Sequence, residues 1–227
     1  MKAITYVAVA AVAAAAGFAI FRYGVQPRVA SAVVAPAAPE TPADTTRDVP
    51  TVLPDFALLD REGAKRSVRS WPGKSMIVNF WATWCAPCRR EIPLLRELQK
   101  TRAGEGFQVV GVAVDFREDV LKYATEIGID YPLLIGEQDG MEAVSSFGLG
   151  SMGFPFTVFT DNKQRIVATH LGELTPPQAL VLLNAVNRVN SGELTPDSAR
   201  VVVAKQLQAM DPHEDHDAGT PQESPRT

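Results

Sequence analysis

The chain has 227 residues, of which 46% are hydrophobic and 21% charged, and its formal net charge is −4. This composition predicts one compact domain with a sizeable core. No run of Lys or Arg is interleaved with aromatic residues, which excludes the electrostatic footprint of a nucleic-acid-binding protein. The two cysteines are too few for the disulfide framework of a small secreted domain, but they suffice for one redox pair.

The chain opens with an uncharged, largely apolar stretch at residues 3–21, AITYVAVAAVAAAAGFAIF. Its 19 residues approach the roughly 20 that cross the hydrocarbon core of a membrane, so residues 1–23 are predicted to form a transmembrane anchor. A cleaved signal peptide is the alternative, because residues 30–32 have small side chains, although the apolar stretch exceeds the usual h-region of about 7–15 residues. Residues 24–48, rich in Ala, Pro, Val and Thr, are expected to form a disordered tether.

The middle of the chain alternates between strand-like and helix-like patterns. The predicted strands cover residues 76–81, 107–114, 131–135, 155–160 and 165–171. The predicted helices cover residues 87–102, 118–127 and 141–147. This alternation favours a sheet that is parallel with crossover helices and antiparallel at one edge, where a polar turn joins the last two strands.

The string GELTP occurs at residues 172–176 and again at 192–196, each time with Thr at a helix N-cap and Pro at the first helical position. Two C-terminal helices are therefore predicted, at residues 176–189 and 196–210. The sequences after the two copies differ, so the repeat indicates a reused cap rather than a duplicated domain. The expected segments after the anchor and tether are one domain at 49–190, an additional helix within 191–210 and a disordered tail at 211–227.

Both cysteines lie in the segment Trp84-Cys85-Ala86-Pro87-Cys88, between a predicted buried strand and the start of a helix. The unpaired N–H groups and the positive end of the helix dipole at that position stabilise a thiolate, which is the attacking species in disulfide exchange. We expect Cys85, exposed at the helix tip, to attack a partner disulfide, and Cys88, one turn inward, to resolve the mixed disulfide.

The segment NFWATWCAPCRREIP, at residues 79–93, resembles the active site of the thioredoxin-like family that includes membrane-tethered cytochrome c maturation reductases. The resemblance covers residues 49 to about 189. It implies an α/β fold, a thioredoxin-like three-layer sandwich with a central mixed sheet flanked by helices, here with an N-terminal transmembrane helix. Residues 152–161, MGFPFTVFTD, resemble the family's cis-proline loop and strand, which implies a cis Pro155 opposite Cys85. Sequence physics alone favours a trans proline there.

One position departs from ordinary thioredoxins, which carry a buried aspartate six residues before the first cysteine. This chain has Asn79 there, and an amide cannot exchange a proton. Glu91 lies three residues after Cys88 on the same helix face, close enough to influence the cysteine pair directly or through water. The tethered reductases carry a glutamate at this position. The alternative is that Glu91 is only a surface acid that favours the helix dipole.

The resemblance also implies a location and partners. The catalytic domain would lie in the periplasm or extracytoplasmic space, held by a single-pass anchor in the cytoplasmic (inner) membrane. A membrane electron donor would re-reduce it, because a dithiol in an oxidising compartment needs a supply of electrons. Its clients would be proteins with oxidised cysteines, such as apocytochrome c or copper-centre assembly proteins. No cofactor and no metal are expected, and the motif alone does not encode the direction of electron flow.

Three other functions are weighed against disulfide reduction. Zinc held by the cysteines with His213 and His216 is disfavoured, because those histidines belong to the acidic tail. A copper chaperone is the main alternative, since thiolates suit Cu(I), and Met152 beside the predicted cis-proline is a candidate soft ligand. A thiol peroxidase is disfavoured, because Thr83 lies two residues before Cys85 where that family's pattern requires three.

Overall fold

The computed structural model describes residues 50–148 and 153–210. The predicted anchor, tether and C-terminal tail all lie outside these ranges, so they stay predictions. Within the described ranges, every helix is too short or too polar to span a lipid bilayer.

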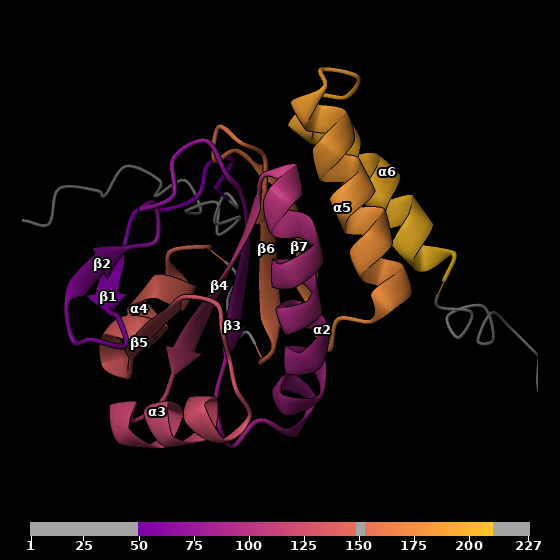
Figure 1. Cartoon of the computed structure of the whole chain (residues 1–227). Coiled ribbons are helices and arrows are strands. Elements are labelled where there is room, and N and C mark those ends of the chain that lie inside the picture. Colours follow the sequence, from indigo (N-terminus) through magenta and orange to yellow (C-terminus); the bar gives the residue numbers. More distant parts are fainter. Residues whose placement is uncertain (1–49, 149–152, 211–227) are drawn as a thin grey trace, which may run out of the picture. The chain divides into compact units, whose positions relative to one another are not determined.

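A seven-stranded mixed sheet forms the centre of the domain, in the order β2-β1-β5-β4-β3-β6-β7 (Figure 1). The strands are β1 (Ala57–Leu59), β2 (Lys65–Ser67), β3 (Ser75–Trp81), β4 (Phe107–Val114), β5 (Leu133–Gly136), β6 (Phe156–Thr160) and β7 (Ile166–Leu171). The three central strands β5, β4 and β3 are parallel, and β6 and β7 are antiparallel.

The sheet has a second antiparallel edge that the sequence pattern did not predict. There β1 pairs antiparallel with both β2 and β5. Both missed strands have only three residues, too few for a clear alternation of apolar and polar positions. A side chain shapes their hairpin instead: Asp60 Oδ1 accepts hydrogen bonds from the N–H groups of Glu62 and Ala64.

The helices are α2 (Ala86–Arg102), α3 (Arg117–Glu126), α4 (Gln138–Ser145), α5 (Pro176–Asn190) and α6 (Pro196–Gln208), with a 3-10 turn η1 (Ala103–Glu105). They match the predicted helices closely except α4, which begins three residues before the predicted start. The difference includes Gly140, a weak helix former by itself. Gly140 packs against β4, where an added Cβ would lie 3.3 Å from Val114 Cγ2, so tertiary packing accounts for a helical glycine.

Two hydrophobic clusters lie on opposite faces of the sheet. In β3, Ile77 and Trp81 belong to one cluster, whereas Val78 and Phe80 belong to the other, as the period of two in a strand requires. The first cluster contains buried side chains of α2, α3, α5 and α6, and the second contains those of α4. The arrangement is the three-layer α/β sandwich that the resemblance implied.

The two GELTP copies begin α5 and α6, as predicted. Thr175 and Thr195 are the N-caps; Thr195 Oγ1 accepts from the Ser198 N–H at 3.2 Å. Helix α6 packs against α5 and β7 (Figure 1), and its Arg200 donates to the carbonyl oxygen of Ile166 in β7 at 2.7 Å. The last helix therefore covers the outer edge of the sheet.

Candidate active site

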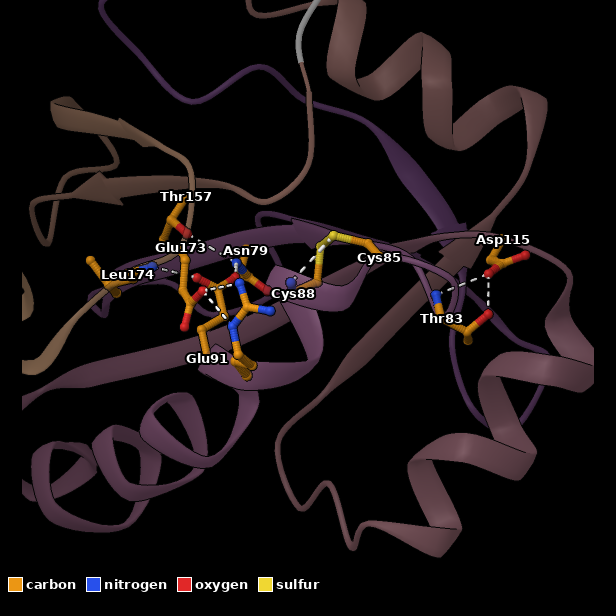
Figure 2. Close-up of a disulfide and its surroundings, with 10 residues drawn as sticks. Asn79, Thr83, Cys85, Cys88, Glu91, Asp115, Thr157, Glu173 and Leu174 are labelled. Carbon is orange, nitrogen blue, oxygen red and sulfur yellow. Dashed lines mark hydrogen bonds and ion pairs between the residues drawn. A yellow bond between two sulfur atoms is a disulfide. The ribbon is translucent and has the colours of Figure 1, made fainter.

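The cysteine pair lies where β3 gives way to α2. Cys85 is the N-cap of the helix, and its Sγ accepts a hydrogen bond from the Cys88 N–H at 3.3 Å. Pro87 occupies the first turn, where a missing N–H removes no helical hydrogen bond. Cys85 and Cys88 form a disulfide with an S–S distance of 2.03 Å (Figure 2).

Cys85 is less exposed than the sequence analysis expected. Its exposed fraction is 5%, compared with 0% for Cys88, because its sulfur is bonded to a fully buried partner. The order of the two cysteines is nevertheless as predicted, with the first nearer the surface. The preceding residue, Trp84, is the large exposed group at the site, with 69% of its surface accessible.

The peptide bond between Phe154 and Pro155 is cis, as the resemblance implied. The Pro155 carbonyl oxygen accepts from the Gly172 N–H at 2.9 Å, just before β6 begins. The Phe154 ring lies edge-on to Trp84, with 6.0 Å between ring centroids. This contact brings the proline loop beside the cysteine motif, although about 70 residues of sequence lie between them.

Glu91 is buried, with 1% of its surface exposed, so its interpretation as a surface acid is wrong. Figure 2 shows its carboxylate held from two sides. Asn79 Nδ2 donates to Oε1 at 2.7 Å, and the Leu174 backbone N–H donates to Oε2 at 2.8 Å. Its hydrogen-bond partners among the described residues are thus groups of β3 and of the first GELTP copy, and neither is a sulfur.

Burial raises the pKa of Glu91 to about 7, from an ordinary value of 4.5. The hydrogen bonds from Leu174 and Asn79 favour the carboxylate and oppose this shift, and the charge of Glu173 adds to it. Desolvation is the largest of these effects. A carboxyl group one helical turn from Cys88 therefore titrates near neutral pH.

Asn79 is fully buried, and its position reflects strand pairing rather than local sequence. Antiparallel pairing of β3 with β6 sets Asn79 directly opposite Thr157. Asn79 Nδ2 donates to Thr157 Oγ1 at 2.9 Å as well as to Glu91, whereas its Oδ1 has no hydrogen-bond partner among the described residues. Thr157 was not singled out by the sequence analysis; its only signal was its place two residues after the predicted cis-proline.

A second pair missed by the sequence analysis links the cysteine motif to the end of β4. Asp115 Oδ2 accepts from the Thr83 backbone N–H at 3.0 Å and also from the Thr83 hydroxyl (Figure 2). Its other oxygen, Oδ1, accepts from the Phe116 N–H at 2.8 Å. Asp115 therefore fixes the turn before Trp84 relative to the loop between β4 and α3.

Within residues 50–148 and 153–210, no group of three or more His, Cys, Asp or Glu residues is arranged to hold a metal ion. His213 and His216, the histidines of the zinc alternative, lie outside the described residues, as does Met152 of the copper alternative.

Comparison with protein-family models matches residues 49–182 to the AhpC/TSA family, which is more than half of the chain. Thiol-disulfide oxidoreductase ResA of Geobacillus thermodenitrificans is 32% identical over 122 residues, which cover 53% of this chain and 69% of that protein. Thioredoxin-like protein YneN of Bacillus subtilis is 35% identical over 128 residues, covering 54% and 71%.

Solved structures of thiol–disulfide proteins also resemble this chain. A thiol:disulfide interchange protein of the thioredoxin family from Chlorobium tepidum TLS superposes with a TM-score of 0.50 at 29% identity, covering 70% of this chain and 97% of that one. A secreted thiol-disulfide isomerase from Corynebacterium glutamicum gives a TM-score of 0.51 at 26% identity, covering 67% and 85%. The chain therefore belongs to the AhpC/TSA family and is a thioredoxin-like thiol–disulfide oxidoreductase.

Proposed function

We propose that this oxidoreductase reduces the disulfides of client proteins outside the cytoplasm through Cys85 and Cys88. The observation that carries the proposal is the position of Cys85 Sγ, which accepts a backbone N–H at the N-terminus of the 17-residue helix α2. A sulfur there is stabilised as a thiolate by the N–H groups and by the helix dipole.

The reaction begins with the reduced protein. The Cys85 thiolate attacks one sulfur of the client disulfide, forms a mixed disulfide and releases the other client sulfur as a thiolate. Cys88, as a thiolate, then attacks Cys85 Sγ, which forms the Cys85–Cys88 disulfide and releases the second client thiol. Two electrons pass to the client, and the disulfide in the structure is the oxidised product. A reducing dithiol partner must restore the thiols.

Glu91 is proposed to accept the proton that Cys88 loses before the second step. It is buried one helical turn from Cys88, and its pKa of about 7 lets it bind and release a proton near neutral pH. Asn79 has no titratable group, so it can only orient that carboxylate. Pro155, brought beside the motif by the contact of Phe154 with Trp84, is proposed to border the surface that receives the client.

The N-terminal sequence and the family support a proposed location and proposed clients. Residues 3–21 would anchor the domain in the cytoplasmic membrane through the tether at 24–48, beside a membrane electron donor. Apocytochrome c and copper-centre assembly proteins are the proposed clients. Fractionation tests the anchor: the mature chain should remain in the membrane and keep its first residues. A soluble product that begins near residue 32 would identify a cleaved signal peptide instead.

Trapping tests the roles of the cysteines. Cys88→Ser should accumulate a mixed disulfide with its client, because the attacking thiol is present and the resolving thiol is absent. Cys85→Ser should neither reduce nor trap. Trapping by Cys85→Ser in place of Cys88→Ser would reverse the assignment. The reduction potential of the pair, measured against glutathione, tests the direction: a value no more reducing than the ~−180 mV typical of a disulfide isomerase would contradict a reductant.

A further inference from the structure

A groove of about 330 Å³ lies beside the cysteine motif, and the proposed reaction leaves it unexplained. Its apolar walls are Trp84, Phe116, Met141 and Phe154. Three of these are unusually exposed for large apolar side chains, with accessible fractions of 69% for Trp84, 61% for Phe116 and 43% for Met141. Contiguous exposed apolar surface of this kind is typical of an interaction site.

The backbone segments that carry Trp84 and Phe116 are joined through hydrogen bonds to one carboxylate. Asp115 accepts from Thr83, next to Trp84, and from the Phe116 N–H, so one carboxylate fixes the turns that carry both aromatic rings. Phe154 contacts Trp84 from the proline loop. A groove whose backbone is held in this way loses little backbone conformational entropy when it binds a side chain.

The polar side of the groove is acidic. Glu137 lies in its lining, and neither Lys nor Arg is among the described residues that line it. Exposed acids follow on both neighbouring helices: Glu118 and Asp119 in the first turn of α3, and Glu142 in α4. The nearest cation in sequence, Arg117, donates to the carbonyl oxygens of Asp60 and Arg61. The groove thus joins apolar walls to a negative rim at Glu137.

We propose that this groove selects clients: it binds an extended client segment in which the disulfide cysteine is flanked by a large apolar residue and by a Lys or Arg. The proposal rests on the proposed reduction of client disulfides. The apolar side chain packs between the aromatic rings and Met141, whose flexible thioether adapts to different shapes. The cationic side chain meets the acidic rim at Glu137. Trp84 precedes Cys85 directly, so a segment held here carries its cysteine beside the attacking sulfur.

The test compares rates of thiol exchange with three disulfides. Two are short peptides whose single cysteine carries a thionitrobenzoate leaving group, one with Phe before and Lys after the cysteine, the other with Ala and Glu there. The third is hydroxyethyl disulfide, which is small and uncharged. The reduced full chain in detergent should prefer the Phe/Lys peptide by about tenfold or more, the discrimination expected from one buried apolar side chain.

Variants of the groove should change this preference. Met141→Ser should lower the ratio of the Phe/Lys rate to the hydroxyethyl disulfide rate by about tenfold. Glu137→Lys should shift the preference toward peptides with an acidic residue after the cysteine. Matched controls are Val201→Ser, which changes an exposed apolar residue of α6, and Glu126→Lys, which changes an exposed acid at the end of α3; both should keep the parent ratios.

The outcomes separate the two proposals. A parent chain that fails to reduce even hydroxyethyl disulfide would overturn the proposed reduction. Normal reduction of hydroxyethyl disulfide with equal rates for the two peptides would overturn the groove proposal alone. Sedimentation gives a third measurement: a dimer of the parent that Met141→Ser dissociates would assign the groove to a second copy of this chain and would also overturn the groove proposal.

Discussion

The backbone N–H of Leu174 donates to Glu91 Oε2 across 2.8 Å, although 83 residues separate the two in the sequence. Beside this contact, Arg90 of α2 forms an ion pair with Glu173 at 2.6 Å. The second turn of the active-site helix is therefore joined twice to the first GELTP copy, which leads into α5. The contact also places a backbone donor against the carboxylate whose protonation the proposed reaction uses.

Removal of the Glu91 charge is expected to lower the pKa of the cysteine pair. A carboxylate one helical turn from Cys88 disfavours a second negative charge, so Glu91→Gln should shift the pH profile of thiol alkylation toward lower pH. The measurement is the alkylation rate of the reduced chain between pH 5 and 9. Glu97→Gln, an exposed acid on the same helix, is the control. Overlapping profiles for the parent and Glu91→Gln would mean that water carries the protons of this site.

The same carboxyl should make stability depend on pH. Because the folded-state pKa of Glu91 is about 7 and its ordinary value is 4.5, the folded state binds this proton more tightly than the unfolded state. Protonated Glu91 therefore adds to the free energy of unfolding. This contribution is complete below pH 4.5 and is lost as pH rises through 7. The free energy of unfolding of the oxidised parent, minus that of Glu91→Gln, should fall by about 3 kcal/mol across this interval. Denaturant titrations of both proteins at several pH values measure it, and a constant difference would contradict the raised pKa.

Asn79 is expected to hold down the pKa of Glu91, because its amide donates to the carboxylate. Asn79→Ala should therefore raise that pKa further, and leaving a buried carboxylate oxygen without this donor should destabilise the fold by about 1–3 kcal/mol. The ¹³C shift of the Glu91 carboxyl, followed against pH by NMR, reports the pKa. Thr157→Val is the matched control, because it removes the other partner of Asn79 but keeps the hydrogen bond from Asn79 to Glu91. If this variant raises the pKa of Glu91 as much as Asn79→Ala does, the effect is due to packing and not to the hydrogen bond.

Two valines of α6 test whether the last helix belongs to the folded domain. Val203 is 4% exposed and packs in the cluster that contains α2 and α5, whereas Val201 is 70% exposed. Val203→Ala should lower the free energy of unfolding by about 1–3 kcal/mol, while Val201→Ala should change it by less than about 0.5 kcal/mol. Equal, small effects in chemical denaturation would show that α6 adds nothing to the stability of the domain.

Much of this molecule could be predicted from local sequence. The predicted strands at 76–81 and 107–114 and the predicted helix at 87–102 correspond to β3, β4 and α2 within one residue at each end. The two Thr-Pro caps are local devices, and both begin helices as expected. The placement of Cys85 at a helix N-terminus also follows from neighbours in sequence, because a strand, a short turn and a helix need no distant partner to be recognised.

The partners of Glu91 were decided by tertiary structure alone. Residue spacing placed Glu91 on the face of Cys88, but its burial depends on β3 beneath it and on the loop before α5, which supply Asn79 and the Leu174 N–H. The pairing of Asn79 with Thr157 depends on the register between β3 and β6, and the groove beside Trp84 depends on four separate segments of the chain meeting. Local propensity acts over a few residues, whereas these contacts join positions 12 to 83 residues apart, so they exist only once the sheet has assembled.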